Sequence, residues 1–136
     1  MNNDPRMYVL MRTDLASMNA GKGMAQSHHA AMCFTKDVMK SLNTGVALPR
    51  GLEDWEDQTS QGFGTTITLA VPSEAALIDT VDIALKFGYA ANVVLDPTYP
   101  VTDGAVTHLL QVYTCGYVFV PGDSNPSFLT PFSLHP

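Results

Sequence analysis

The chain has 136 residues, of which 46% are hydrophobic and 15% charged, and its formal net charge at pH 7 is −6. This composition predicts one globular domain with a core, and the acidic balance argues against a protein that coats nucleic acid through a general basic field. The apolar run near the N-terminus, Met7 to Met11, is too short for a signal peptide or a membrane span, so we expect a cytoplasmic protein.

The first elements in chain order are a strand and a helix. Met7 to Met11 is short and continuously apolar, which is typical of a central strand covered on both faces. A polar loop follows, and residues 21–40 lack proline and are rich in Ala and Met, which predicts a helix. Apolar residues at helical spacing predict its buried side, which would consist of Met24, His28, Ala31, Met32, Thr35 and Met39.

A loop, a second strand and a second helix are expected next. Residues 41–64 contain four glycines and predict a loop, with a turn of helix near Leu52 to Asp57. The alternation in Thr66 to Val71 predicts a strand. Ser73 is the expected N-cap of the helix that follows, and Gly88 is its expected stop.

Two more strands complete the expected fold. Residues 91–95 and 106–113 predict strands, 114–120 could add an edge hairpin, and the proline-rich residues 122–136 predict an extended tail. Strands alternating with helices predict a single three-layer α/β/α domain over residues 1–121, with a mixed, mainly parallel four-stranded sheet. The last strand follows its predecessor by a loop alone and could run antiparallel.

Charge and motifs point to a site near the start of the first helix. Residues 1–50 contain six Lys or Arg and three Asp, so an anionic partner, if one binds, should meet this part of the chain, unless these basic groups are merely scattered over the surface. Lys22 follows the first strand and Asp96 ends the third, and the carboxyl ends of parallel strands share one edge of a sheet. Lys22, Gln26 and His29 stand at i, i+4 and i+7 and share a helix face.

The sequence resembles a known enzyme family. The string "MYVLMRTDL…GKGMAQSHHAA" resembles the opening of archaeal and eukaryotic-type (type II) peptidyl-tRNA hydrolases, and the resemblance continues through "TTITLAVPSEAALIDTVDIALKFGYAANVVLD". It implies hydrolysis of the ester between a peptide and tRNA, with no metal or organic cofactor, commonly by a homodimer. It also implies that Lys22, Gln26 and Asp96 form the active site, with His29 on the same helix.

The chain departs from the family after Asp96. The family usually has threonines in this loop, but "DPTYPVTDGAVT" is one residue shorter and has Pro100 and Ala105 at those positions. Thr98, Thr102 or Thr107 could supply a replacement hydroxyl. A non-catalytic tRNA- or protein-binding module of the same fold, or a hydrolase of a different acyl ester, are therefore alternative functions.

Ester hydrolysis assigns a role to each candidate residue. A lysine near a helix N-terminus opposes the helix dipole at a cost of at most about 1 kcal/mol, which is tolerable if Lys22 stabilises the developing oxyanion. Asp96 could activate the water or hold Lys22 through an ion pair, and Gln26 could fix the substrate. Cys33 and His29 have the spacing of a thiol nucleophile and its base on a helix, although packing is the expected role of Cys33. Candidates for phosphate contacts are Arg12, Lys36, Lys40 and Arg50.

Overall fold

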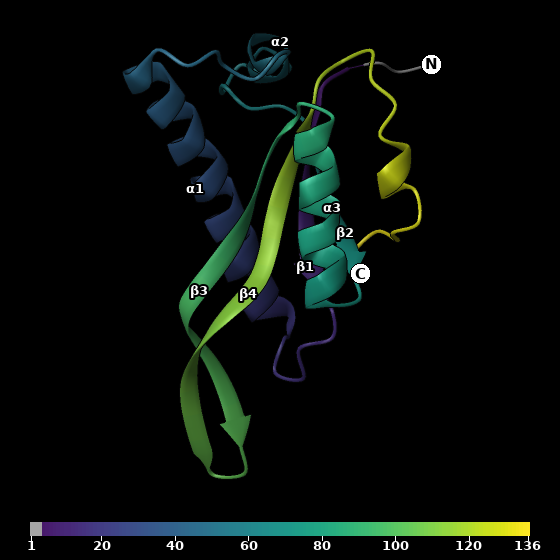
Figure 1. The fold of residues 1–136 in the computed structure, drawn as a ribbon. Coiled ribbons are helices and arrows are strands. Elements are labelled where there is room, and N and C mark those ends of the chain that lie inside the picture. Colours follow the sequence, from purple (N-terminus) through teal and green to yellow (C-terminus); the bar gives the residue numbers. More distant parts are fainter. Residues whose placement is uncertain (1–3) are drawn as a thin grey trace.

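A computed structural model describes residues 4–136 as an α/β fold with one open, four-stranded sheet (Figure 1). The elements in chain order are β1 (Arg6–Arg12), α1 (Ala20–Thr44), α2 (Leu52–Glu56), β2 (Thr66–Val71), α3 (Glu74–Lys86), β3 (Ala90–Asp103), β4 (Val106–Val120) and the 3-10 turn η1 (Ser127–Leu129). The predicted strand at Thr66–Val71, the turn of helix near Leu52 and the Ser73 N-cap are confirmed. No helix in this part of the chain is long and apolar enough to cross a membrane.

The sheet is mixed, and the prediction that it is mainly parallel is wrong. The strand order is β2-β1-β4-β3, in which only β1 and β2 are parallel and β4 runs antiparallel to both of its neighbours. A two-residue turn joins β3 to β4, and Gly104 supplies the positive φ of +60° that such hairpin turns favour. Strands β1 and β3 both run antiparallel to β4, and β2 runs parallel to β1, so β1, β2 and β3 point in the same direction. Their carboxyl ends therefore lie at one edge of the sheet, as predicted.

Residues 114–120 do not form an edge hairpin. They are the inner half of β4, which lies between β1 and β3, and all seven are buried. A strand covered on both faces loses the alternation that marks a half-exposed strand, so this segment gave no clear periodic signal.

Helices pack against the two faces of the sheet. On one face, Phe34 of α1 stacks on Phe119 of β4 at 5.4 Å between ring centroids, and Trp55 of α2 meets the same ring edge-on at 5.9 Å. On the other face, Leu77 and Val81 of α3 pack on the sheet. Both faces therefore carry a core that fixes the strands beneath the helices.

The buried side of α1 differs from the predicted one. Met24 and Met39 are 71% and 48% exposed, His28 is also exposed, and the predicted stripe faces outward. The residues that pack inward are Gly23, Gln26, Ala30 and Phe34. Hydrophobic periodicity missed this face because two of its members are small and one is polar.

The C-terminal segment packs on the domain. Leu129 is buried beside α3, and residues 133–135 run along the free edge of β2. The N–H of Ala70 donates to the carbonyl of Ser133 at 2.8 Å, and the N–H of His135 donates to the carbonyl of Thr68 at 2.9 Å. These bonds pair the edge of β2 with the chain's own end.

Beyond Asp96, β3 and β4 continue as a two-stranded ribbon, residues 97–111, which projects past the end of α1 (Figure 1). Cross-strand partners include Tyr99 with Leu110 and Thr102 with Thr107. The base of this ribbon adjoins the N-terminus of α1, where the candidate site lies.

Candidate active site

The N-terminus of α1 is capped, and it places Lys22 in the first helical turn. The Asn19 side chain accepts a hydrogen bond from the backbone N–H of Lys22 at 2.9 Å, which satisfies one of the otherwise unpaired N–H groups there. Gly21 and Gly23 lie within the helix, and neither has a positive φ. A side-chain carbon at Gly23 would meet nothing within 4 Å.

The base of the ribbon holds the Lys22 side chain. Its Nζ donates to the carbonyl of Pro100 at 3.3 Å and lies 5.5 Å from the centroid of the Tyr99 ring. Ser17 Oγ donates to the same carbonyl at 3.2 Å. Within residues 4–136, Lys22 forms no ion pair with Asp96, so the suggested direct pairing of the two is absent.

Gln26 connects the helix to both β3 and β4. Its side chain is only 4% exposed, its Nε2 donates to Asp96 Oδ2 at 2.8 Å, and its Oε1 accepts from Thr114 Oγ1 at 2.6 Å. Because the ionised carboxylate can only accept, the amide nitrogen must face Asp96, and the amide oxygen accepts from the Thr114 hydroxyl. Sequence reasoning missed Thr114, because it lies in a buried strand with no motif around it.

Irregularities in the β3–β4 pairing aim these side chains at α1. The register shifts once after Val94, which leaves Thr114 without a cross-strand partner, and again between Asp96 and Tyr99. Neighbouring residues of a regular strand face opposite ways, yet Thr114 and Cys115 both contact Gln26. Asp96 and Tyr99 are three residues apart and both face α1 for the same reason. The two bulges therefore turn toward α1 side chains that would face opposite sides of a regular pair of strands.

Asp96 is held in its ionised form. Partial burial raises its pKa, but hydrogen bonds from the Gln26 side chain and the Thr98 backbone N–H, together with the nearby His29, lower the pKa below its ordinary value. Thr98 Oγ1 also contacts Asp96 Oδ1 at 3.4 Å. The site thus combines a lysine ammonium, a carboxylate and a buried amide at one edge of the sheet.

The three threonines suggested by the sequence lie in different places. Thr98 contacts Asp96, whereas Thr102 and Thr107 face each other across the exposed end of the ribbon. Of the three, only Thr98 is brought to the carboxylate.

Arg12 braces the end of β1. Its Nε and Nη2 donate to both carboxylate oxygens of Asp14 at 2.9 and 2.8 Å, and its Nη1 donates to the carbonyl of Tyr113 at 2.9 Å. The hydrogen bond from Arg12 holds the pKa of Asp14 below its ordinary value. Most donors of this largely buried guanidinium are thus already used inside the protein.

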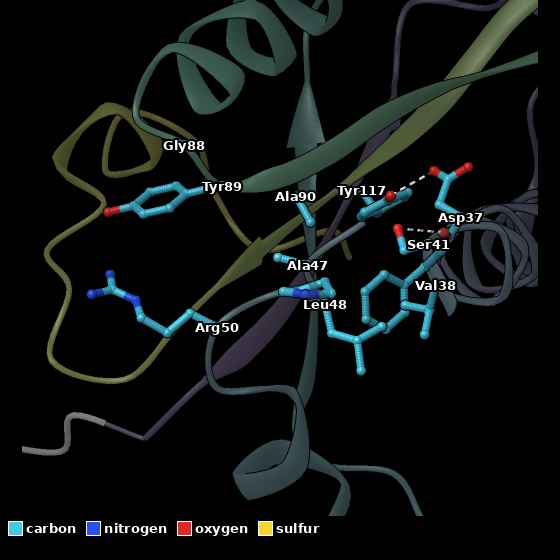
Figure 2. Close-up of a pocket in the computed structure, with 12 residues that line it drawn as sticks. Asp37, Val38, Ser41, Ala47, Leu48, Arg50, Gly88, Tyr89, Ala90 and Tyr117 are labelled. Carbon is cyan, nitrogen blue, oxygen red and sulfur yellow. Dashed lines mark hydrogen bonds between the residues drawn. The ribbon is translucent and has the colours of Figure 1, made fainter. Parts of the chain in front are cut away.

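The remaining basic residues that the sequence suggested for the site are exposed. His29 lies on α1 beside Asp96, and Lys36 and Lys40 lie farther along the same helix. Arg50 lines a separate pocket of about 380 Å³, where it and Tyr89 lie opposite Asp37 and Ser41 (Figure 2). That pocket adjoins the other half of α1.

Cys33 does not form a thiol and base pair with His29. Its Sγ lies 3.9 Å from Asp37 Oδ2, and burial, reinforced by the Asp37 charge, raises the pKa of the thiol to about 11. At neutral pH the sulfur is therefore a protonated, poorly nucleophilic thiol.

The fold and the clustered lysine, amide and carboxylate define an α/β protein with a polar site suited to acyl-ester hydrolysis. The family model of peptidyl-tRNA hydrolase PTH2 matches residues 5–110, and the chain belongs to this family. The resemblance noted in the sequence is thereby confirmed, and the protein is a peptidyl-tRNA hydrolase, an enzyme that acts on ester bonds. No curated protein matches the chain.

Proposed function

We propose that Lys22, Asp96 and Gln26 are the residues with which this enzyme cleaves the ester of peptidyl-tRNA. The observation that carries the proposal is the hydrogen-bonded chain from Thr114 through Gln26 to Asp96, beside a lysine on the same helix face. Membership of the family identifies peptidyl-tRNA as the substrate. The lysine, the amide and the carboxylate are the groups that we propose for the reaction.

In the proposed reaction, water attacks the ester carbonyl carbon while the Asp96 carboxylate orients it and accepts its proton. Lys22 stabilises the negative charge that develops on the carbonyl oxygen. The bond between the acyl carbon and the ribose oxygen then breaks, and the proton passes to that oxygen, giving a free peptide acid and free tRNA. Both ends of the Gln26 amide are already bonded, so its role is to hold Asp96 rather than to contact the substrate.

The exposed basic residues of α1 are the proposed contacts for tRNA. His29, Lys36 and Lys40 lie on one helix that begins at the site, and a duplex running from the ester along this helix would meet them in turn. Arg12 and Thr98 are proposed to act indirectly, by bracing the strand ends and Asp96.

Release of N-acetyl amino acid from N-acetyl-aminoacyl-tRNA tests the site. We expect Lys22→Ala and Asp96→Asn each to lower kcat/KM at least tenfold, about 1.4 kcal/mol of barrier. Matched controls are Lys86→Ala and Asp82→Asn on α3, which change the same charges on the other face of the sheet. Full activity in either site variant, or an equal loss in its control, would contradict the proposed assignment.

The finer points of organisation are also proposals. We propose that residues 1–121 form a three-layer hydrolase domain to which residues 122–136 are attached, and that the enzyme acts as a homodimer in the cytoplasm. Helix packing on both faces supports the layers, and the resemblance supports the dimer. Light scattering at micromolar concentration tests the dimer directly.

A further inference from the structure

The ribbon beyond the site has an unusual surface. Residues 90–120 contain no Lys or Arg, and the ribbon exposes large apolar side chains, among them Val106 at 56%, Leu109 at 65% and Leu110 at 46%. A two-stranded ribbon that exposes this much apolar surface gains little stability by itself in water. Its position next to Lys22 and Asp96 connects it to the site rather than to a remote part of the fold.

The register divides these side chains between two faces. Directly opposed residues share a face, so Leu110 lies with Tyr99 and Val112 lies with Asp96. Val106 and His108 continue the same row, because they follow at intervals of two residues. Leu109 pairs with Pro100 and belongs to the opposite face. A row that is apolar except at His108, with Asp103 opposite Val106 at its outer end, thus leads outward from Asp96 along the face that carries the candidate site.

The absence of Lys and Arg from the ribbon indicates which half of the substrate binds to this row. Peptidyl-tRNA has a polyanion on one side of the ester and a peptide on the other. The ribbon offers no lysine or arginine for phosphate, whereas α1 carries Lys36 and Lys40. The row spans seven residues, from Val106 to Val112, which corresponds to about 20 Å of extended chain.

We infer that the row formed by Val106, Leu110 and Val112 binds the peptide half of peptidyl-tRNA as an extended chain, while the tRNA lies along α1. This inference rests on the proposed function, because it takes the scissile ester to lie between Lys22 and Asp96. The peptide is held by its apolar side chains, so peptides rich in apolar residues are the favoured substrates.

Strand addition to the outer edge of β3 is not the mode of binding. Pro97 and Pro100 have no N–H to donate, and the Pro100 carbonyl is already bonded to Lys22 and Ser17. The face of the ribbon, rather than its edge, is therefore the surface available to a peptide.

Kinetics with two substrates tests the inference. One is N-acetyl-leucyl-tRNA, and the other is a tRNA that carries an apolar peptide long enough to reach Val106. We expect the wild type to prefer the longer substrate in kcat/KM by about fivefold or more, and Val106→Ser combined with Leu110→Ser to abolish the preference. Leu109→Ser is the matched control, because it removes an exposed leucine from the opposite face of the same strand.

The shorter substrate should be unaffected by all three substitutions. Equal kcat/KM for both substrates in the wild type would overturn the inference, as would an equal loss of preference in Leu109→Ser. Thermal unfolding of each variant checks that the ribbon substitutions leave the domain folded.

Binding without turnover separates this inference from the proposed catalytic site. The probe is a fluorescent apolar peptide joined by an amide to 3′-amino-3′-deoxyadenosine, followed by anisotropy. Weaker binding in the Val106→Ser, Leu110→Ser variant but not in Leu109→Ser supports the peptide face even if ester hydrolysis fails. If the wild type hydrolyses the ester but all variants bind the probe equally, the proposed peptide-binding face is wrong. The proposed catalytic site would be unaffected by that result.

Discussion

At the scale of single residues, Thr114 holds the Gln26 amide in place. The Thr114 hydroxyl donates to Oε1, while Nε2 of the same amide donates to Asp96. Asp96 owes part of its lowered pKa to that donor. The ionisation of a partly exposed carboxylate thus depends on a fully buried threonine that does not contact it.

Thr114→Val should change the pH dependence of catalysis. Without the hydroxyl, the amide oxygen loses its partner and the amide is held less firmly, so its hydrogen bond to Asp96 weakens and the pKa of Asp96 rises. Activity that requires the carboxylate is lost as pH falls through this pKa, so the acid limb of kcat/KM should move to higher pH. The buried Oε1 left without a partner should also cost about 1–3 kcal/mol of stability.

A pH profile of ester hydrolysis from pH 4 to 8 provides the measurement, with Thr114→Ser as control because serine keeps the donor. An acid limb that coincides with that of the wild type in Thr114→Val would contradict the proposed chain from Thr114 to Asp96.

At the scale of elements, Gly116 allows β4 to lie close to β3. A side-chain carbon at this position would come within 2.6 Å of the carbonyl oxygen of Asn92 and 3.3 Å of Leu77 on α3. Because backbone rather than a flexible side chain is in the way, the strand itself would have to shift.

Gly116→Ala is therefore expected to destabilise the protein by about 1–3 kcal/mol. Urea unfolding measures the change. Gly23→Ala is the control, because its added carbon meets nothing within 4 Å in a helix, and it should stabilise by roughly 0.5–1 kcal/mol. Equal stability of the two variants would show that the close approach at Asn92 does not constrain the strand.

The elements themselves were predictable where the signal is local. The alternation of Thr66–Val71, the Ser73 cap and the apolar run of β1 depend on neighbouring residues, and the structure confirms them. One partner of β4, the strand β1, lies about a hundred residues away, so the central place of β4 could not be read locally, whereas its antiparallel pairing with β3 follows from the short connection between them. The face of α1 was misassigned because methionines mark its exposed side.

The candidate site was predictable only in part. Lys22, Gln26 and Asp96 came from helix spacing, the shared edge of the sheet and a family resemblance, and the structure brings Gln26 to Asp96. Thr114, Tyr99 and Asn19 were missed. Two of them depend on bulges, and a bulge changes which face a residue occupies without leaving a periodic pattern in the sequence.

At the scale of the whole molecule, charge is divided between the halves of the chain. The first fifty residues carry a net charge of +3 within a chain of net charge −6. Association with tRNA is therefore expected to depend on the few cations of α1 rather than on a general field.

Lys36→Ala combined with Lys40→Ala should weaken the salt dependence of KM for the tRNA substrate. Each phosphate that the variant no longer neutralises should reduce the slope of log KM against log salt concentration by about 0.7–0.9. Lys86→Ala, which removes a lysine from α3, should leave the slope unchanged. A slope equal to that of the wild type in the double variant would show that tRNA follows another path.

The pairing of the sheet also sets the order in which the chain can fold during synthesis. β1 emerges before its partners, one of which is β4, and the outer edge of β2 pairs with residues 133–135. Long separations in sequence slow folding, and segments made early must wait for those made last. The nascent chain therefore carries an unfinished sheet until residues 133–135 have been added, and it should be prone to aggregation until then.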